Sequence, residues 1–229
     1  MDANALTRVP GPAHGEPSRR ALDVGRVVAI AVFAVMGTLN AIALPRHWAG
    51  GASPDVLGAL TATLTVAVYT LFVAAYLRRG PAASSDDRGV AWAVALAATV
   101  APFAVPLLAS GHVGAQRSVL AALVLAGGLA GMIWSLHALG SNFSLIPQAR
   151  SVAADGPYRW VRHPVYTAEL IAVTGMCLAA GGLAPWAVLL ALVALQMLRA
   201  RREEALLLRV LPGYAEYSSR TPMLVPWLR

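Results

Sequence analysis

Six mostly apolar segments, separated by short polar intervals, dominate this 229-residue chain. A helix needs roughly 20 apolar residues to cross a bilayer, and the first four segments are about that long. The last two are shorter and are joined by Gly181, Gly182, Leu183 and Ala184, a pattern typical of a tight antiparallel helical hairpin. The segments are residues 24–44, 56–77, 90–109, 119–139, 166–180 and 185–198.

The composition supports lipid as the solvent for these segments. Hydrophobic residues make up 58% of the chain and charged residues 13%, about half the charged fraction of a soluble protein. The core of a water-soluble protein of this size would not hide so much apolar surface. We therefore predict an all-α, polytopic integral membrane bundle of about six transmembrane helices, with Pro102 and Pro106 kinking the third.

Arginine placement predicts the orientation of the bundle. All 18 basic residues are arginine, and 16 of them fall on one side if six segments cross the membrane; only Arg46 and Arg117 fall on the other. Cytoplasmic loops carry such an excess, so both termini are predicted to be cytoplasmic. The net charge of +7 then reflects topology, and no nucleic-acid partner is expected. The lack of lysine suggests a GC-rich genome, and we predict a bacterial cytoplasmic membrane.

Polar residues gather in two intervals on the predicted cytoplasmic side, residues 140–166 and 199–229. Acidic residues do little for orientation and are costly near hydrocarbon, so the pair Glu203 and Glu204 is expected to have a partner or a task. The single cysteine, Cys177, excludes an internal disulfide and a multi-cysteine metal site. The histidines lack metal-ligand spacing, and no metal is predicted. Residues 1–23 read as a disordered cytoplasmic tail and not as a signal peptide.

The two intervals carry a recognisable pattern: GPYRWVRHPVY, a helical hairpin, an EE pair and GYAEY. This pattern resembles the isoprenylcysteine carboxyl methyltransferase family and the related phospholipid methyltransferases, which are membrane enzymes that use S-adenosyl-L-methionine. The resemblance covers roughly residues 140–229. It divides the chain into a four-span membrane region, 24–139, and a methyltransferase-like region, 140–229.

The resemblance implies where the cofactor binds. Gly156 begins the turn before the motif, where glycine permits a positive φ. Tyr158 is implied as an aromatic wall of the cofactor cleft, and Glu203, with Glu204 beside it, as the carboxylate for the cofactor's ribose or amino group. The remaining residues implied to line or hydrogen-bond the cofactor are Arg162, His163, Pro164 and Tyr166 beside the hairpin, and Gln148, Ser151, Val152 and Ala153 near the adenine.

Three residues are candidates for the catalytic site: Arg199, Glu203 and Glu169. Arg199 precedes Glu203 by four residues, so the two share a helix face, and in the family's pattern this arginine faces the acceptor. A carboxylate acceptor is already ionised at neutral pH and needs no base. An amine or a thiol must lose a proton, and Glu169 or His163 would then take it.

The acceptor is expected to be lipophilic, either a small molecule or a prenylated substrate, and to enter sideways from the bilayer among membrane lipids. The cofactor would enter from the cytoplasm. A carboxylate acceptor agrees best with the resemblance, although the stretch LPGYAEY departs from the family's usual pattern.

Other interpretations stay open. Membrane steroid-type reductases, which use NADPH, also place a proline, a tyrosine and an acid before their last helices, as Pro164, Tyr166 and Glu169 would do here. The RHP triplet and the EE pair argue against them. A non-catalytic scaffold or carrier predicts polar residues along a membrane path, whereas the middles of the first four spans contain almost no ionisable groups. On physics alone, His163 would cap a helix and the glutamates would pair with neighbouring arginines.

Overall fold

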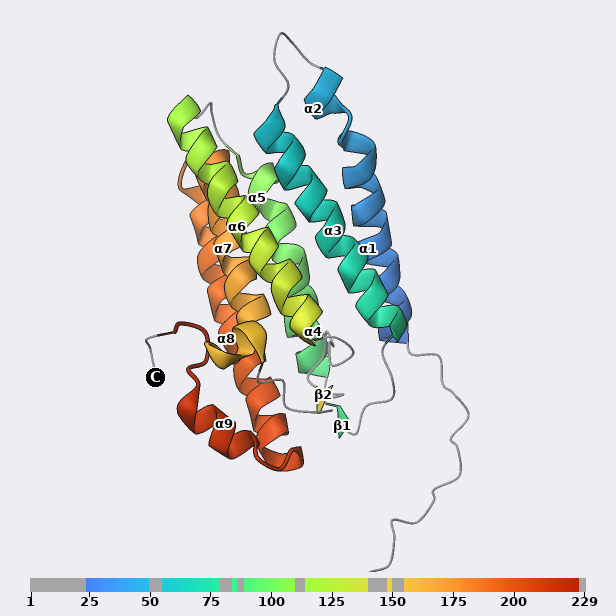
Figure 1. Ribbon diagram of the computed structural model, residues 1–229, viewed down its shortest axis with the longest axis vertical. Helices are drawn as coiled ribbons and strands as arrows, with labels where there is room; N and C mark the ends of the chain where they lie inside the picture. The colour runs from blue at the N-terminus through green and yellow to red at the C-terminus, as the bar shows by residue number, and fades with distance from the viewer. Residues whose placement is uncertain are drawn as a thin grey trace, which may run out of the picture.

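A computed structural model describes residues 24–49, 55–78, 84–85, 89–109, 114–139, 148–149 and 155–226. These ranges form a helical bundle with one two-residue antiparallel strand pairing, β1 with β2 (Figure 1). The predicted all-α fold is confirmed. The elements are α1 (Val24–Ala43), α2 (Arg46–Ala49), α3 (Val56–Arg78), β1 (Ser84–Ser85), α4 (Gly89–Val100), η1 (Ala101–Phe103), α5 (Ala104–Leu107), α6 (Ala115–Leu139), β2 (Gln148–Ala149), η3 (Gly156–Arg159), α7 (Pro164–Ala180), α8 (Ala184–Val210) and α9 (Tyr214–Arg220).

Each predicted apolar segment is helical. Within the described ranges, five helical segments are long and apolar enough to cross a membrane, and α7 is a shorter apolar helix. The third segment is interrupted where the sequence predicts a kink: α4 ends at Val100, and a 3-10 turn containing Pro102 precedes α5. Proline lacks the N–H that would continue the helical hydrogen bonds, and its ring clashes with the preceding turn.

Helices α7 and α8 form the predicted hairpin. Gly181 and Gly182 join them with φ of 69° and 68°, a conformation that glycine adopts without steric cost. The second arm continues as one helix to Val210, well past the predicted end of the apolar segment at residue 198. The charged residues that follow the apolar segment, Arg199 and Glu203 among them, therefore lie on a rigid helix.

Helices α6 and α7 make the most extensive helix–helix contact of the described bundle, and small residues line part of it. A Cβ added at Gly128 would lie 2.3 Å from the backbone nitrogen of Ala172, and one at Gly175 would lie 2.5 Å from that of Leu125. Backbones that approach this closely are typical of membrane helices, in which van der Waals packing drives association. Helix α3 packs on α6, α1 packs on α3, and α4 and α7 both pack on α8.

We expect Gly128→Ala to lower the thermal unfolding midpoint of the detergent-solubilised protein by several degrees, because α6 and α7 must separate to admit the methyl group. Gly127→Ala is the matched control, since a Cβ there meets nothing within 4 Å. The control should leave the midpoint unchanged or raise it slightly, because alanine favours helix by about 1 kcal/mol over glycine. Equal midpoints for the two variants would contradict this packing.

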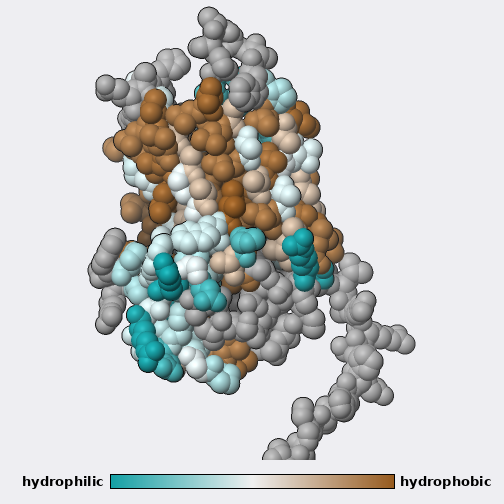
Figure 2. Space-filling model, viewed as in Figure 1, coloured by the Kyte–Doolittle hydropathy of each residue, from teal (hydrophilic) through white to brown (hydrophobic). Residues whose placement is uncertain are grey.

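The face of the molecule seen in Figure 2 carries a broad apolar belt over the helices, and hydrophilic residues gather beside α9. Large exposed side chains in the belt include Val35, Leu39, Leu60, Leu123 and Leu190. Together with the lengths of the helices, this belt makes the chain an integral membrane protein. The first turn of α1 lies at the same end of the bundle as α9, and we call this end the α9 end (Figure 1).

Candidate functional site

The RHP segment is held at the α9 end by the chain that follows α9. The backbone N–H of Arg162 donates to the carbonyl of Pro222 at 2.9 Å, and that of His163 donates to Met223 at 3.1 Å. One turn further into α7, the Thr167 hydroxyl donates to the carbonyl of Leu224 at 2.8 Å. These contacts fix the start of α7 against residues about 60 positions away in the sequence.

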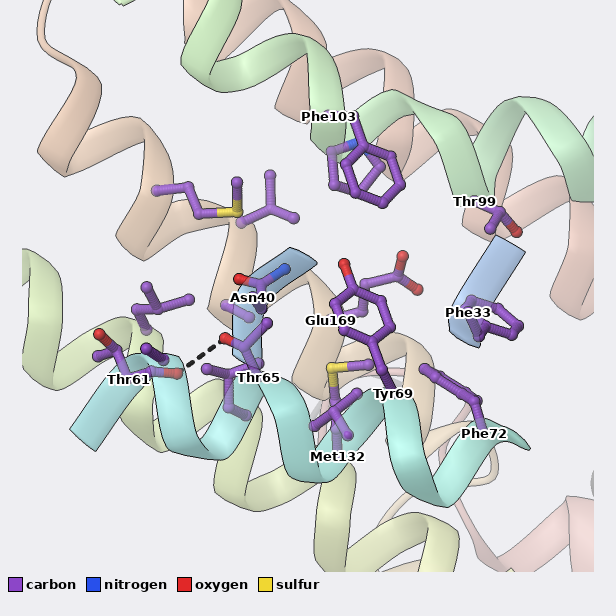
Figure 3. Close-up of a pocket in the computed structure, with 18 of the residues that line it drawn as sticks. Phe33, Asn40, Thr61, Thr65, Tyr69, Phe72, Thr99, Phe103, Met132 and Glu169 are labelled. Atoms are coloured by element: carbon purple, nitrogen blue, oxygen red, sulfur yellow. Dashed lines mark hydrogen bonds between the residues drawn. The ribbon is translucent and has the colours of Figure 1, made fainter. Parts of the chain in front are cut away.

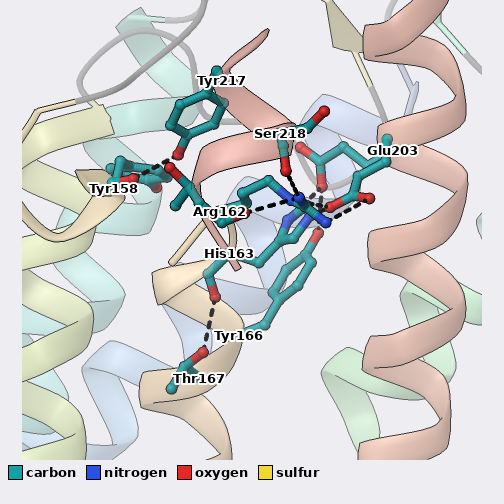
Figure 4. Close-up of polar contacts among 10 residues, drawn as sticks. Tyr158, Arg162, His163, Tyr166, Thr167, Glu203, Tyr217 and Ser218 are labelled. Atoms are coloured by element: carbon teal, nitrogen blue, oxygen red, sulfur yellow. Dashed lines mark hydrogen bonds and ion pairs between the residues drawn. The ribbon is translucent and has the colours of Figure 1, made fainter. Parts of the chain in front are cut away.

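Arg162 joins this segment to α8 and α9 (Figure 4). Its guanidinium makes a two-point contact with Glu204, with Nε 2.7 Å from Oε1 and one terminal nitrogen 3.1 Å from Oε2. The other terminal nitrogen donates to the carbonyls of Ser218 and, at 2.8 Å, Thr221. Such paired N–H···O bonds fix orientation as well as charge. Each nitrogen of this guanidinium thus donates within the chain, and its predicted cofactor contact stays a prediction.

The imidazole of His163 lies between the two glutamates of α8. Its Nε2 is 3.1 Å from Oε1 of Glu204, and its Nδ1 is 3.7 Å from Oε2 of Glu203. His163 occupies the position before α7, yet its side chain makes no hydrogen bond that caps the helix. The ring instead stacks on Tyr166, with centroids 5.3 Å apart and planes 2° from parallel.

Glu203 and Glu204 have different surroundings. The Glu204 side chain, held by Arg162 and His163, is 13% exposed, whereas that of Glu203 is 28% exposed. Glu203 accepts a hydrogen bond of 2.9 Å from the Tyr166 hydroxyl. Of the two carboxylates, Glu203 is thus the more accessible to a ligand. Glu204 serves the packing of the α9 end.

Tyr166 also contacts the predicted acceptor-facing arginine. The guanidinium carbon of Arg199 lies 4.7 Å from the centroid of the Tyr166 ring, a cation–π distance. Arg199 itself is 8% exposed. One tyrosine therefore contacts Glu203 through its hydroxyl and Arg199 through its ring face.

The turn before the motif is tied to α9. Gly156 has φ of 59°, which confirms the glycine turn expected from the sequence. Tyr158 is buried, and its backbone carbonyl accepts a 2.6 Å hydrogen bond from the Tyr217 hydroxyl. Burial raises the pKa of Tyr158 far above its usual value, and burial with the nearby Glu204 charge raises that of Tyr217 to about 12. Both phenols are therefore protonated at neutral pH, and Tyr217 remains a donor.

Above this network, on the membrane side, the helices enclose a cavity of about 430 Å³ (Figure 3). Tyr166, Glu169 and Arg199 line it where it approaches the α9 end. Gln196, fully buried, links two of them, because it donates to Glu169 at 2.6 Å and accepts from Arg199 at 3.3 Å. The apolar walls come from five helices and include Phe33, Phe72, Leu129, Val165 and Val173.

The residues singled out from the sequence gather at the α9 end in part. His163, Tyr166 and Glu203 are in direct contact, Tyr158 joins them through Tyr217, and Pro164 begins α7. The backbone of Gln148 lies in β2, which packs against α8, the helix that carries Glu203. Ser151, Val152 and Ala153 lie outside the described residues. The functional roles of all these residues stay predictions.

Sequence reasoning missed two side chains and one backbone segment of this site. Tyr217 is the second tyrosine of the quoted GYAEY stretch, and its spacing from Tyr214 was an available signal. Gln196 was a lone amide in an apolar helix, three residues before Arg199. The carbonyls of Pro222, Met223 and Leu224 gave no signal, because backbone acceptors are present in every sequence.

Two comparisons with known proteins match parts of this chain. The phospholipid methyltransferase family model matches residues 116–212, which include α6, the RHP segment, the hairpin and both glutamates of α8. The cobalt-zinc-cadmium resistance protein CzcN of Cupriavidus metallidurans is 35% identical over 79 residues, or 34% of this chain. The match spans 37% of that protein. In the described part of this chain, no group of three histidine, cysteine, aspartate or glutamate residues is placed to hold a metal ion.

The matched region contains the RHP segment and all of α8, whereas α9 and the backbone acceptors that follow it lie beyond residue 212. Residues 116–212 match the phospholipid methyltransferase family, which belongs to the isoprenylcysteine carboxyl methyltransferase-like group of membrane methyltransferases.

Proposed function

We propose that this chain transfers a methyl group from S-adenosyl-L-methionine to a lipophilic acceptor in the membrane, and that the acceptor atom is a carboxylate oxygen. One observation carries the proposal. Tyr166 connects the polar network at the α9 end, through Glu203, with the apolar cavity, through Arg199. A polar cofactor and a lipophilic acceptor would meet at such a junction.

The residues present fit the cofactor. S-adenosyl-L-methionine has a sulfonium cation, hydroxyl and amino donors and an aromatic base. Glu203 offers a partly exposed carboxylate for the donors, and the stacked rings of His163 and Tyr166 offer an aromatic surface near a cation. When bound, the cofactor supplies an electrophilic methyl group, so that a carbon–oxygen bond forms as the carbon–sulfur pair returns to sulfur.

The cavity fits the acceptor. Its volume of about 430 Å³ lies within the range of small-molecule sites, and its walls are mainly apolar. Arg199 lines it at the junction and would orient a carboxylate there. Because methyl transfer is an in-line displacement, what these residues contribute is orientation and the exclusion of water.

Glu169 has a defined task under this proposal. A lone arginine in an apolar cavity would be costly, and Glu169, linked to Arg199 through Gln196, offsets its charge before an acceptor arrives. A carboxylate acceptor releases no proton, so Glu169→Gln should leave transfer within a few-fold of the wild type. A loss of about 100-fold or more would instead assign Glu169 as the base for an amine or thiol acceptor.

The proposal includes a separate access route for each substrate. The acceptor, a lipophilic small molecule or a prenylated substrate, reaches the cavity from the bilayer. The cofactor reaches the α9 end from the cytoplasm, where the arginine distribution would also place both termini. A bacterial cytoplasmic membrane fits this arrangement.

The decisive test is calorimetric titration of the purified protein with S-adenosylhomocysteine, with NADPH titrated in parallel. Micromolar binding of S-adenosylhomocysteine is expected, with no heat from NADPH. Binding of NADPH alone would favour a reductase, and binding of neither would contradict an enzyme that uses either cofactor.

A further inference from the structure

The cavity continues far beyond the junction at Arg199. Gly58, on the first turn of α3, and Phe72, near the other end of the same helix, both line it. They are fourteen residues apart, which corresponds to roughly 21 Å along a helix. The cavity therefore follows α3 through most of an apolar layer about 30 Å thick.

The side chains that α3 contributes to the cavity wall change from aromatic to polar with distance from Arg199. Gly58, Thr61, Thr65, Tyr69 and Phe72 follow one another at spacings of three or four residues, so they share one face of the helix. The half nearer Arg199 carries the aromatic rings, and the far half carries the two threonines. Asn40, near the end of α1, adds an amide to the far half (Figure 3).

These far-end polar groups present acceptor oxygens. The Thr61 hydroxyl donates to the carbonyl of Gly58 at 2.9 Å, and the Thr65 hydroxyl donates to that of Thr61 at 2.8 Å. The Asn40 amide nitrogen donates to the carbonyl of Met36 at 2.9 Å. Both hydroxyl donors and one N–H of the Asn40 amide are thus used within their own helices. The lone pairs of the hydroxyls and of the amide oxygen suit a donor on a ligand.

The far end is bordered by a polar pair. Nδ1 of His47, which also lines the cavity, is 2.9 Å from Oδ2 of Asp55. The Gly58 N–H donates to the other Asp55 oxygen at 2.9 Å, and this bond and His47 lower the pKa of Asp55. Asp55 is therefore ionised at neutral pH, and the far end of the cavity is polar like the end at Arg199.

We propose that the acceptor is a bipolar lipid, with its carboxylate at Arg199 and a hydroxyl group at Thr61, Thr65 and Asn40. This proposal rests on the proposed function only for the carboxylate at Arg199. A purely apolar tail would leave the free lone pairs of these oxygens without a donor, whereas a hydroxyl group on the ligand would supply one. A site built for a hydroxyl discriminates against analogues that lack it.

The test compares straight-chain fatty acids with their ω-hydroxy counterparts of equal length, across a series of lengths. Calorimetric affinity and methyl transfer from labelled S-adenosyl-L-methionine are both measured. At the optimal length we expect the ω-hydroxy acid to bind about 10-fold or more tightly than the plain acid, since 1.4 kcal/mol is a factor of ten. Equal affinities at every length, or no binding of either acid, would overturn the proposal.

A pair of variants locates the effect. Thr61→Val/Thr65→Val keeps the shape of the cavity and should abolish the preference for the hydroxyl. Thr63→Val is the matched control, because Thr63 is exposed on the same helix and its hydroxyl donates to Ala59. A preference that survives the double variant would overturn the assignment. Preferential binding without methyl transfer would contradict the carboxylate-methylating function and leave the bipolar cavity standing.

Discussion

Glu203→Ala is expected to weaken the binding of S-adenosylhomocysteine about 100-fold or more. Glu203 is the more accessible of the two glutamates beside the stacked His163 and Tyr166 rings. Each hydrogen bond to a charged group is worth about 1.5–3 kcal/mol, and a carboxylate that binds two donors would therefore account for a loss of this size. Isothermal titration calorimetry of the purified variant measures the change directly.

Variants of two other glutamates serve as controls that distinguish a loss of binding from a loss of folding. Glu204→Ala leaves the partly buried Arg162 guanidinium without its carboxylate partner, and it should lower the free energy of unfolding by at most about 3–5 kcal/mol, the cost for a fully buried pair. Glu216→Ala removes an exposed residue whose ion pair with Arg220 lies at the surface, and it should change neither stability nor affinity. Unchanged affinity in a well-folded Glu203→Ala variant would remove this residue from the cofactor site.

Arg199→Met should abolish methyl transfer while leaving S-adenosylhomocysteine binding within a few-fold of the wild type. The guanidinium lines the cavity and lies over the Tyr166 ring, so its loss removes the group that would hold the acceptor carboxylate. Removing one preorganised charged or hydrogen-bonding group from an active site costs about 100- to 1,000-fold in kcat. The rate is measured with labelled S-adenosyl-L-methionine, and affinity is measured by calorimetry on the same preparation.

The charge left behind in this variant needs its own control. Without Arg199, Glu169 would face the cavity unneutralised, so Arg199→Met/Glu169→Gln restores a neutral cavity and should fold like the wild type but remain inactive. Arg201→Met changes an exposed arginine of the same helix and should retain full activity. Activity in the folded double variant would show that the acceptor is not held by Arg199.

The sequence determined the membrane architecture. A bilayer needs apolar helices of a certain length, so the sequence alone predicted the six apolar segments. It also predicted the proline interruption after Val100 and the α7–α8 hairpin. The sequence also predicted the turn at Gly156, because a positive φ is a local requirement that glycine meets. The resemblance to membrane methyltransferases rested on the motif around His163, and the family match confirmed it.

Only the tertiary structure decided how the polar residues divide their tasks. Arg162, Glu204 and the carbonyls that follow α9 bind one another across more than forty residues of sequence, and so Glu203 is left as the more accessible carboxylate. The cavity and the Gln196 link between Glu169 and Arg199 depend on helices that meet only in the folded bundle. Residue spacing reveals a helix face, whereas the residues that this face meets depend on how distant helices pack, because side-chain contacts between them form only in three dimensions.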